Sequence, residues 1–189
     1  MPAAKRISKE AIIDAAAAVL RSGGFEAINA RSVAKALGCS TQPIYLSFRN
    51  MEELKSALTQ RAIEQHTQRV RESLRAHEGR DSRYSSYGMG FVQFAAQEKQ
   101  LFRWLYLEDN QPGRHQEDVL EPEIIRTVMD EFGYDEVTAR AFHRDMTYYS
   151  YGLAILANTG HLALTETELR EAFRREFRAL AAYYGPPKK

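Results

Sequence analysis

The chain of 189 residues contains a single cysteine, and this scarcity excludes two kinds of structure. Because Cys39 is the only thiol, no disulfide forms within one chain and no zinc site is built from several thiolates. The sequence also lacks a run of about 18 apolar residues, and its basic, alanine-rich N-terminal region lacks the uninterrupted apolar core of a signal segment. We therefore expect a soluble, cytoplasmic protein that does not enter a membrane.

The motifs of the common catalytic sites are missing as well. The chain has no Gly-rich phosphate loop, no Gly-x-Ser-x-Gly elbow and no His-Glu-x-x-His helix. Its five histidines are scattered, and no acid–base or nucleophilic group of residues can be named. We therefore expect neither an enzyme nor a cofactor nor a metal site.

Helical periodicity is what the chain does contain. Apolar residues recur at intervals of three and four through nearly every segment, and no segment alternates with the two-residue period of a strand. The pattern predicts an all-α fold of about nine helices. Helix starts are predicted at capping residues Ser8, Asn29, Ser40, Asn50, Asp135 and Thr165.

Charge and aromatic content differ between the two ends of the chain. Residues 1–60 hold eight Lys and Arg against five Asp and Glu, which makes this third the better candidate for binding anions. Aromatic residues concentrate beyond residue 80. We expect an N-terminal domain of residues 1–50, a connecting helix over 51–77 and a C-terminal domain of residues 78–189.

Residues 29–50 predict two short helices joined by a tight turn, the helix-turn-helix arrangement that reads DNA. Gly38 ends the first helix, and five apolar residues brace the pair: Val33, Ala34, Leu37, Ile44 and Phe48. The exposed face of the second helix is then polar and aromatic. Gln42 is the best candidate for a base contact, through its amide to adenine.

Other residues around this helix are expected to complete the contact with DNA. Thr41 and Pro43 are predicted to pack against thymine methyl groups, and Tyr45 to reach a phosphate or a base. The remaining DNA-binding candidates, predicted mainly to contact phosphates, are Asn29, Arg31, Ser40, Arg49 and Lys55.

In these residues the chain resembles the TetR (tetracycline-repressor-like) family of bacterial regulators. The resemblance is carried by residues 12–20, Gly24-Phe25, Val33-Ala34, Leu37-Gly38, Ser40-Thr41, Ile44-Tyr45, Phe48, Asn50 and residues 52–54. It implies a homodimer that binds a pseudo-palindromic operator, most often as a repressor, and releases it when a small molecule enters the C-terminal domain. Asn29 and Cys39 depart from the residues common in the family, but both are compatible with the motif.

The C-terminal domain carries more aromatic residues than one helix–helix contact requires. We expect some of them to line a cavity for a moderately hydrophobic effector, although core or dimer packing is the commoner role of such residues. The candidates are Phe91, Phe94, Phe102, Trp104, Tyr148 and Tyr151, with His143 and Asn158 to orient the ligand. The last two helices, around 142–156 and 169–184, are expected to form the homodimer as a four-helix bundle.

Two other interpretations remain open at this point. The long apolar stripes are also compatible with a helical protein-interaction module in which the N-terminal motif is accidental. Alternatively, Cys39 is a redox switch beside the second helix of the motif, although a structural thiol is the commoner role of a lone cysteine.

Overall fold

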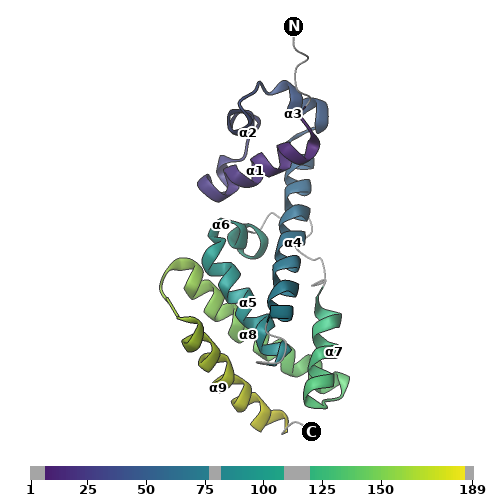
Figure 1. The fold of residues 1–189 in the computed structure, drawn as a ribbon, viewed down its shortest axis with the longest axis vertical. Coiled ribbons are helices and arrows are strands. Elements are labelled where there is room, and N and C mark those ends of the chain that lie inside the picture. Colours follow the sequence, from purple (N-terminus) through teal and green to yellow (C-terminus); the bar gives the residue numbers. More distant parts are fainter. Residues whose placement is uncertain (1–6, 77–81, 109–119, 186–189) are drawn as a thin grey trace. The chain divides into compact units, whose positions relative to one another are not determined.

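The computed structural model describes residues 7–76, 82–108 and 120–185. These residues form nine α-helices, one 3-10 turn and one π-helical turn, and they contain no strand, which confirms the predicted all-α class (Figure 1). The elements are α1 Lys9–Gly23, η1 Phe25–Ala27, α2 Ala30–Leu37, α3 Gln42–Ser47, α4 Met51–Ala76, α5 Arg83–Gln97, α6 Lys99–Phe102, η2 Arg103–Leu107, α7 Glu121–Phe132, α8 Glu136–Thr159 and α9 Glu166–Tyr184. None of the described helices is apolar over a length that would cross a bilayer.

The chain divides into two compact units. Unit 1 comprises residues 1–65 and 98–114, and unit 2 comprises residues 66–97 and 115–189. The division predicted from the sequence assigns residues 98–108 to the C-terminal domain, whereas the structure groups α6 and η2 with unit 1. The predicted end of the connecting helix at His77 lies outside the described residues.

Side-chain caps start several helices as the sequence predicts. The side chains of Ser8, Asn29, Asp135 and Thr165 each accept a hydrogen bond from a backbone N–H in the first turn of the following helix. The prediction that Ser40 caps the third helix is wrong. That helix begins at Gln42, its N-cap is Thr41, and no side chain caps it. Pro43 lies in the first turn of this helix and has no N–H group. One fewer backbone donor therefore lacks a hydrogen-bond partner at this end of the helix.

Unit 1 is held together by a small apolar core. Helix α1 packs against α2 and α6. The side chains that fill this core are at most 1% exposed and come from four helices: Ile12, Leu20, Val33, Ile44, Leu54 and Leu58. Because Ile44 anchors the short α3 in this core, the opposite side of α3 faces solvent.

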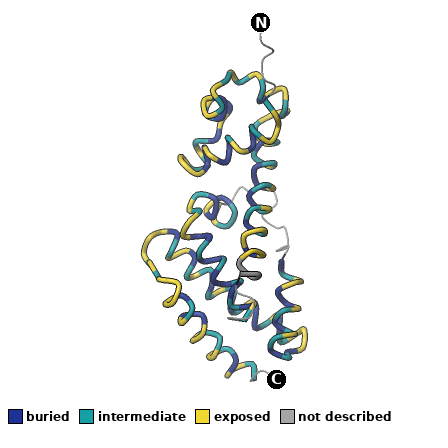
Figure 2. The backbone as a smooth tube through the Cα atoms, viewed as in Figure 1, coloured by how far each residue is buried: buried dark blue, intermediate teal, exposed yellow. Residues whose placement is uncertain are grey.

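Unit 2 is built around α5 and α8, which pack along one another and contact α7 and α9. Figure 2 shows α5 buried along most of its length and α9 largely exposed. Gly88 of α5 lies against the ring of Phe173 of α9, and a Cβ atom at residue 88 would stand 2.6 Å from Cε1 of that ring. The close contact between α5 and α9 therefore depends on a glycine at this position.

Candidate nucleic-acid interface

The turn between α2 and α3 is fixed by a residue in the left-handed conformation. Gly38 has φ of +65°, which glycine adopts without the steric penalty of a side chain. Its N–H bonds back to α2, and the N–H of Cys39 donates to the carbonyl of Ala34 over 3.0 Å. At the other end of α2, the Oδ1 atom of Asn29 accepts hydrogen bonds from the N–H groups of Arg31 and Ser32. Both ends of α2 are thus closed by local hydrogen bonds.

Helix α3 presents two different faces. Ile44 and Phe48 point into the core and are 1% and 2% exposed. Gln42 and Tyr45 are exposed, and Thr41 and Pro43 are half-buried beside them. Among the described residues, the side chains of Gln42 and Tyr45 have no hydrogen-bond partner, so their polar groups are available to a ligand. The structure therefore brings the predicted base-contacting residues together on one outward surface.

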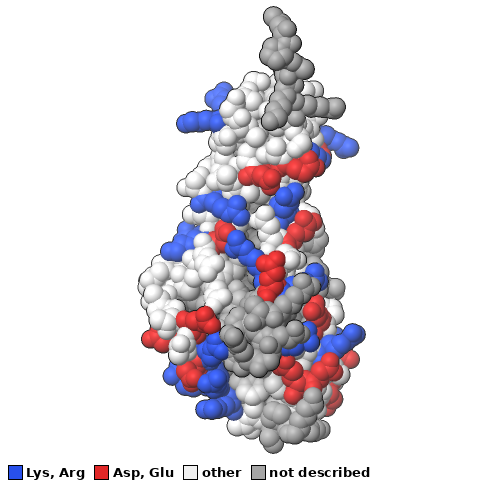
Figure 3. Space-filling model, in the orientation of Figure 1, with Lys and Arg blue, Asp and Glu red and all other residues white. Residues whose placement is uncertain are grey.

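Arg31 and Lys35 of α2 form no salt bridge among the described residues. Arg49 after α3 forms none either, although its charge acts on the nearby carboxylate of Glu53. Figure 3 shows basic side chains projecting from the surface near α2. Other basic side chains of unit 1 do form salt bridges: Arg21 lies 2.9 Å from Glu98, and Arg61 lies 3.1 Å from Asp14. Unpaired guanidinium and ammonium groups are the ones free to meet phosphates.

Two of the predicted phosphate contacts, Lys55 and Asn29, also interact with other groups of the protein. The Nζ atom of Lys55 lies 3.1 Å from a carboxylate oxygen of Glu52 and 4.5 Å from the centre of the Phe25 ring. Its side chain is only 19% exposed. In Asn29, Oδ1 caps α2 and Nδ2 donates to the carbonyl of Ala27. These two residues therefore stabilise unit 1 whether or not they also contact DNA.

Sequence reasoning missed two residues of this surface. Lys35 follows Arg31 by four residues, a spacing that puts both on one side of α2 and that is visible in the sequence. Leu46 is 79% exposed on α3, beside Tyr45. Its position gives no sequence signal, because a leucine in a short amphipathic helix is ordinarily assigned to the core.

The junction between α3 and α4 is tied by a carboxylate. The side chain of Asn50, a predicted capping residue, accepts the N–H of Glu53 over 2.9 Å. In return, Glu53 Oε2 accepts the N–H of Arg49, the residue before Asn50, over 2.8 Å. This backbone hydrogen bond, with help from Lys9, lowers the pKa of Glu53. The backbone after α3 is thereby held to the first turn of α4.

Two of the predicted ligand-binding aromatics lie in unit 1. Phe102 and Trp104 are buried there, in α6 and η2. The Trp104 ring packs on Phe25 with centroids 4.3 Å apart, and its Nε1 donates to the hydroxyl of Thr59 over 3.0 Å. The structure therefore separates these two residues from the other six candidates, which all lie in unit 2.

The six candidates in unit 2 lie in different surroundings. Phe91 and Phe94 are buried on α5 around His66, and Tyr151 of α8 packs against Phe91 with centroids 4.9 Å apart. Asn158 is 1% exposed and donates to the carbonyl of Ala95. The remaining two are Tyr148, which faces solvent, and His143, which lies 3.0 Å from the Tyr84 hydroxyl.

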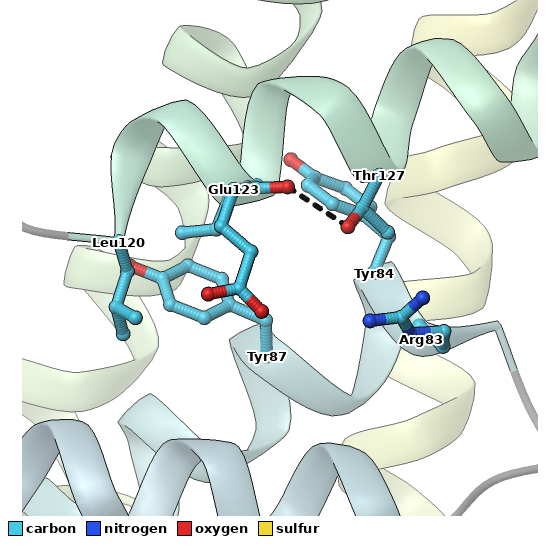
Figure 4. A pocket seen from close by; sticks show the side chains of 7 residues that line it. Arg83, Tyr84, Tyr87, Leu120, Glu123 and Thr127 are labelled. Carbon is cyan, nitrogen blue, oxygen red and sulfur yellow. Dashed lines mark hydrogen bonds between the residues drawn. The ribbon is translucent and has the colours of Figure 1, made fainter.

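A small cleft lies at the start of α5, beside α7 (Figure 4). Its lining consists of Arg83, Tyr84, Tyr87, Leu120, Glu123, Ile124 and Thr127. None of the predicted ligand residues lines it, although Nδ1 of His143 lies 3.0 Å from the hydroxyl of Tyr84, which does. Burial raises the pKa of the Tyr84 hydroxyl, which stays protonated and able to donate. In the described residues no cluster of His, Cys, Asp and Glu is arranged to hold a metal.

The helices around this surface match a known protein family. The sequence profile of the family described as bacterial regulatory proteins, tetR family, matches residues 12–58, which span most of α1, then α2, α3 and the start of α4. No curated protein matches the chain.

Several solved structures share the fold. A protein of unknown function from Rhodococcus sp. RHA1 has a TM-score of 0.73 and 21% identity, over 96% of this chain and 99% of that one. A TetR family transcription regulator from Marinobacter aquaeolei VT8 has a TM-score of 0.64 and 17% identity, over 90% and 94%. The multidrug binding protein EbrR, in complex with malachite green, has a TM-score of 0.57 and 17% identity, over 91% and 96%.

Proposed function

Through residues 12–58 the chain belongs to the TetR family of bacterial regulatory proteins, and we propose that it is a repressor that binds a pseudo-palindromic operator as a homodimer. The observation that carries the proposal is the outward face of α3. Gln42 and Tyr45 stand there without partners in the described residues, braced from behind by Ile44. A helix braced in this way inserts its exposed side chains into the major groove.

Binding divides between two kinds of contact. Arg31, Lys35 and Arg49 bind phosphates and set the orientation of α3, and Gln42 reads a base edge through its amide. Lys55 contributes less than the sequence predicts, because Glu52 already neutralises it. Each protomer then reads one half-site, and two half-sites about 34 Å apart need two protomers held at that spacing.

The homodimer forms through α8 and α9. No charged residue occurs between Asp145 and Glu166, yet this run leaves Tyr148 and Leu156 exposed at 67% and 44%. Gly152 lies on the same exposed side, and a Cβ atom added there would meet nothing within 4 Å. An uncharged, exposed helix face with room for close approach suits a second copy of itself.

The effector is a small hydrophobic molecule that binds in unit 2 and lowers operator affinity. Two features support this part. Phe91 and Phe94 are buried and Tyr151 packs against Phe91, and EbrR, which shares the fold, is complexed with malachite green. A screen of hydrophobic compounds for loss of operator binding tests it. If no compound that binds the protein changes its affinity for the operator, ligand control is wrong while DNA binding stands.

Selection of bound sequences from a random DNA pool tests the main proposal. We expect enrichment of an inverted repeat whose half-sites are centred about one helical turn apart. The matched control is the Gln42→Ala variant, for which the enriched sequence should lose its preference at one position of each half-site. Enrichment of no sequence, or of a single unrepeated site, contradicts the proposal.

A further inference from the structure

Leu46 is an exposed large apolar side chain of α3, more exposed than Tyr45 beside it. It follows Gln42 by four residues, so the two side chains share one side of the helix, one turn apart. Ile44, two residues from each of them, points the opposite way and is 1% exposed, whereas Leu46 is 79% exposed. A large apolar side chain therefore stands beside the residue that we expect to read a base.

Exposure alone does not identify a partner, because single exposed leucines are common on protein surfaces. The surroundings of Leu46 are what restrict the choice. Gln42 and Tyr45 flank it. Arg31 and Lys35, which form no salt bridge in the described residues, lie on α2, and Arg49 follows α3. Cationic side chains around a narrow helix face complement a polyanion and do not suit an apolar protein surface.

The major groove offers an apolar side chain one distinctive target. Leucine neither donates nor accepts hydrogen bonds, so it does not distinguish the donor and acceptor patterns of the bases. The C5 methyl group of thymine is the apolar feature that projects into this groove. On the premise of operator binding, we infer that Leu46 is a second specificity residue, which selects thymine by packing on its methyl group.

The helix geometry says where that thymine lies. Four residues of α-helix advance about 6 Å along the axis, which corresponds to roughly two base pairs of B-form DNA. The thymine read by Leu46 therefore lies within about two base pairs of the position read by Gln42. Burial of one methyl group corresponds to about fourfold in affinity.

Replacement of thymine by deoxyuridine tests the inference, because it removes only the methyl group. In the selected operator, each thymine is replaced in turn, and the affinities of the wild type and of Leu46→Ala are measured by fluorescence anisotropy. At one thymine per half-site we expect the wild type to bind about fourfold more weakly after replacement, and Leu46→Ala to be unaffected. Leu46→Met, which keeps an apolar side chain, and Gln42→Ala should both retain the penalty.

The possible results separate the inference from the proposed function. If operator binding persists but every deoxyuridine penalty is the same in the wild type and Leu46→Ala, Leu46 does not read thymine. If no sequence is selected at all, operator binding itself fails, and the inference fails with it. Thermal unfolding by circular dichroism checks that Leu46→Ala is folded, which its exposure leads us to expect.

Discussion

At the scale of single residues, the six residues of α3 divide into one that packs on the core and others that face solvent, where we propose that they contact DNA. Ile44 carries the helix on the core of unit 1, and Gln42 and Leu46 face outward one turn apart. Arg31 and Lys35 on α2 add positive charge without acidic partners in the described chain. A substitution at an outward residue should therefore alter DNA binding without altering folding.

Gln42→Ala and Lys35→Ala should weaken binding in different ways. If its amide reads a base edge as proposed, Gln42→Ala should lose about 1–3 kcal/mol of discrimination at one base position. Lys35→Ala should weaken all sequences alike and reduce the slope of log affinity against log salt by about 1. Titrations over single-base operator variants and several salt concentrations distinguish these effects, and a uniform loss for Gln42→Ala would reject its reading role.

Trp104→Phe should destabilise unit 1, because the variant loses the hydrogen bond from the indole N–H to the buried hydroxyl of Thr59. We expect the free energy of unfolding to fall by about 1–3 kcal/mol. Thr59→Val removes the other partner of the same bond. Urea unfolding is measured for both single variants and for the double variant. The double variant should lose less unfolding free energy than the two single variants lose together, and strictly additive losses would argue against this bond.

At the scale of the elements, local signals predict where most helices begin, and tertiary contacts decide the rest. Asn29 and Thr165 cap their helices as predicted, because a cap needs only the next three residues. The prediction that Ser40 caps α3 is wrong, because Pro43 in the first turn has no N–H group and the helix forms without a side-chain cap.

In the candidate site, too, some positions follow from the local sequence and others depend on tertiary contacts. The outward position of Gln42 follows from the apolar spacing of α2 and α3. By contrast, Trp104 packs on Phe25, which is 79 positions away in the sequence, and Lys55 pairs with Glu52 instead of facing outward. No periodicity encodes which unit an aromatic residue joins, so the predicted set of ligand residues is spread over two units.

The capping box of α9 should make its stability depend on pH. Glu168 accepts hydrogen bonds from the N–H and the hydroxyl of Thr165, and the backbone bond is the main reason that its pKa lies below the ordinary 4.5. A lowered pKa stabilises the fold above about pH 4.5, and this contribution is lost as the pH falls through the lowered value.

Glu168→Gln should therefore show a flatter loss of unfolding free energy than the wild type as the pH falls below about 4.5. Denaturant unfolding followed by circular dichroism at a series of pH values measures this difference. Identical pH profiles would show that the carboxylate does not cap the helix in solution.

Gly88→Ala should loosen the contact between α5 and α9, because the new methyl group would stand 2.6 Å from the ring of Phe173. We expect a loss of about 1–3 kcal/mol in unfolding free energy, despite the better helix propensity of alanine. Phe173→Leu in the same background should relieve part of the clash, so that the double variant loses less than the two single changes together. An unchanged or raised stability of Gly88→Ala would contradict the contact.

At the scale of the whole molecule, the proposed homodimer brings two copies of α3 to the operator, so we expect operator binding to depend on the exposed, uncharged part of α8. Tyr148→Glu places a carboxylate on this face, where the proposed dimer would bury the charge without a partner. We expect dimer affinity to fall by at least about a hundredfold, and operator affinity to fall with it. Sedimentation velocity at micromolar concentration checks the first effect, with Tyr148→Phe as the control that should remain dimeric.

Sequence discrimination tests the central claim most directly. The affinity of the wild type for its selected operator is compared with its affinity for a scrambled duplex of the same length and base composition, at physiological salt. An outward α3 that reads base edges predicts binding to the operator at least about a thousandfold tighter. Equal affinities for the two duplexes would show that this surface attracts phosphates without reading sequence, and would contradict the account.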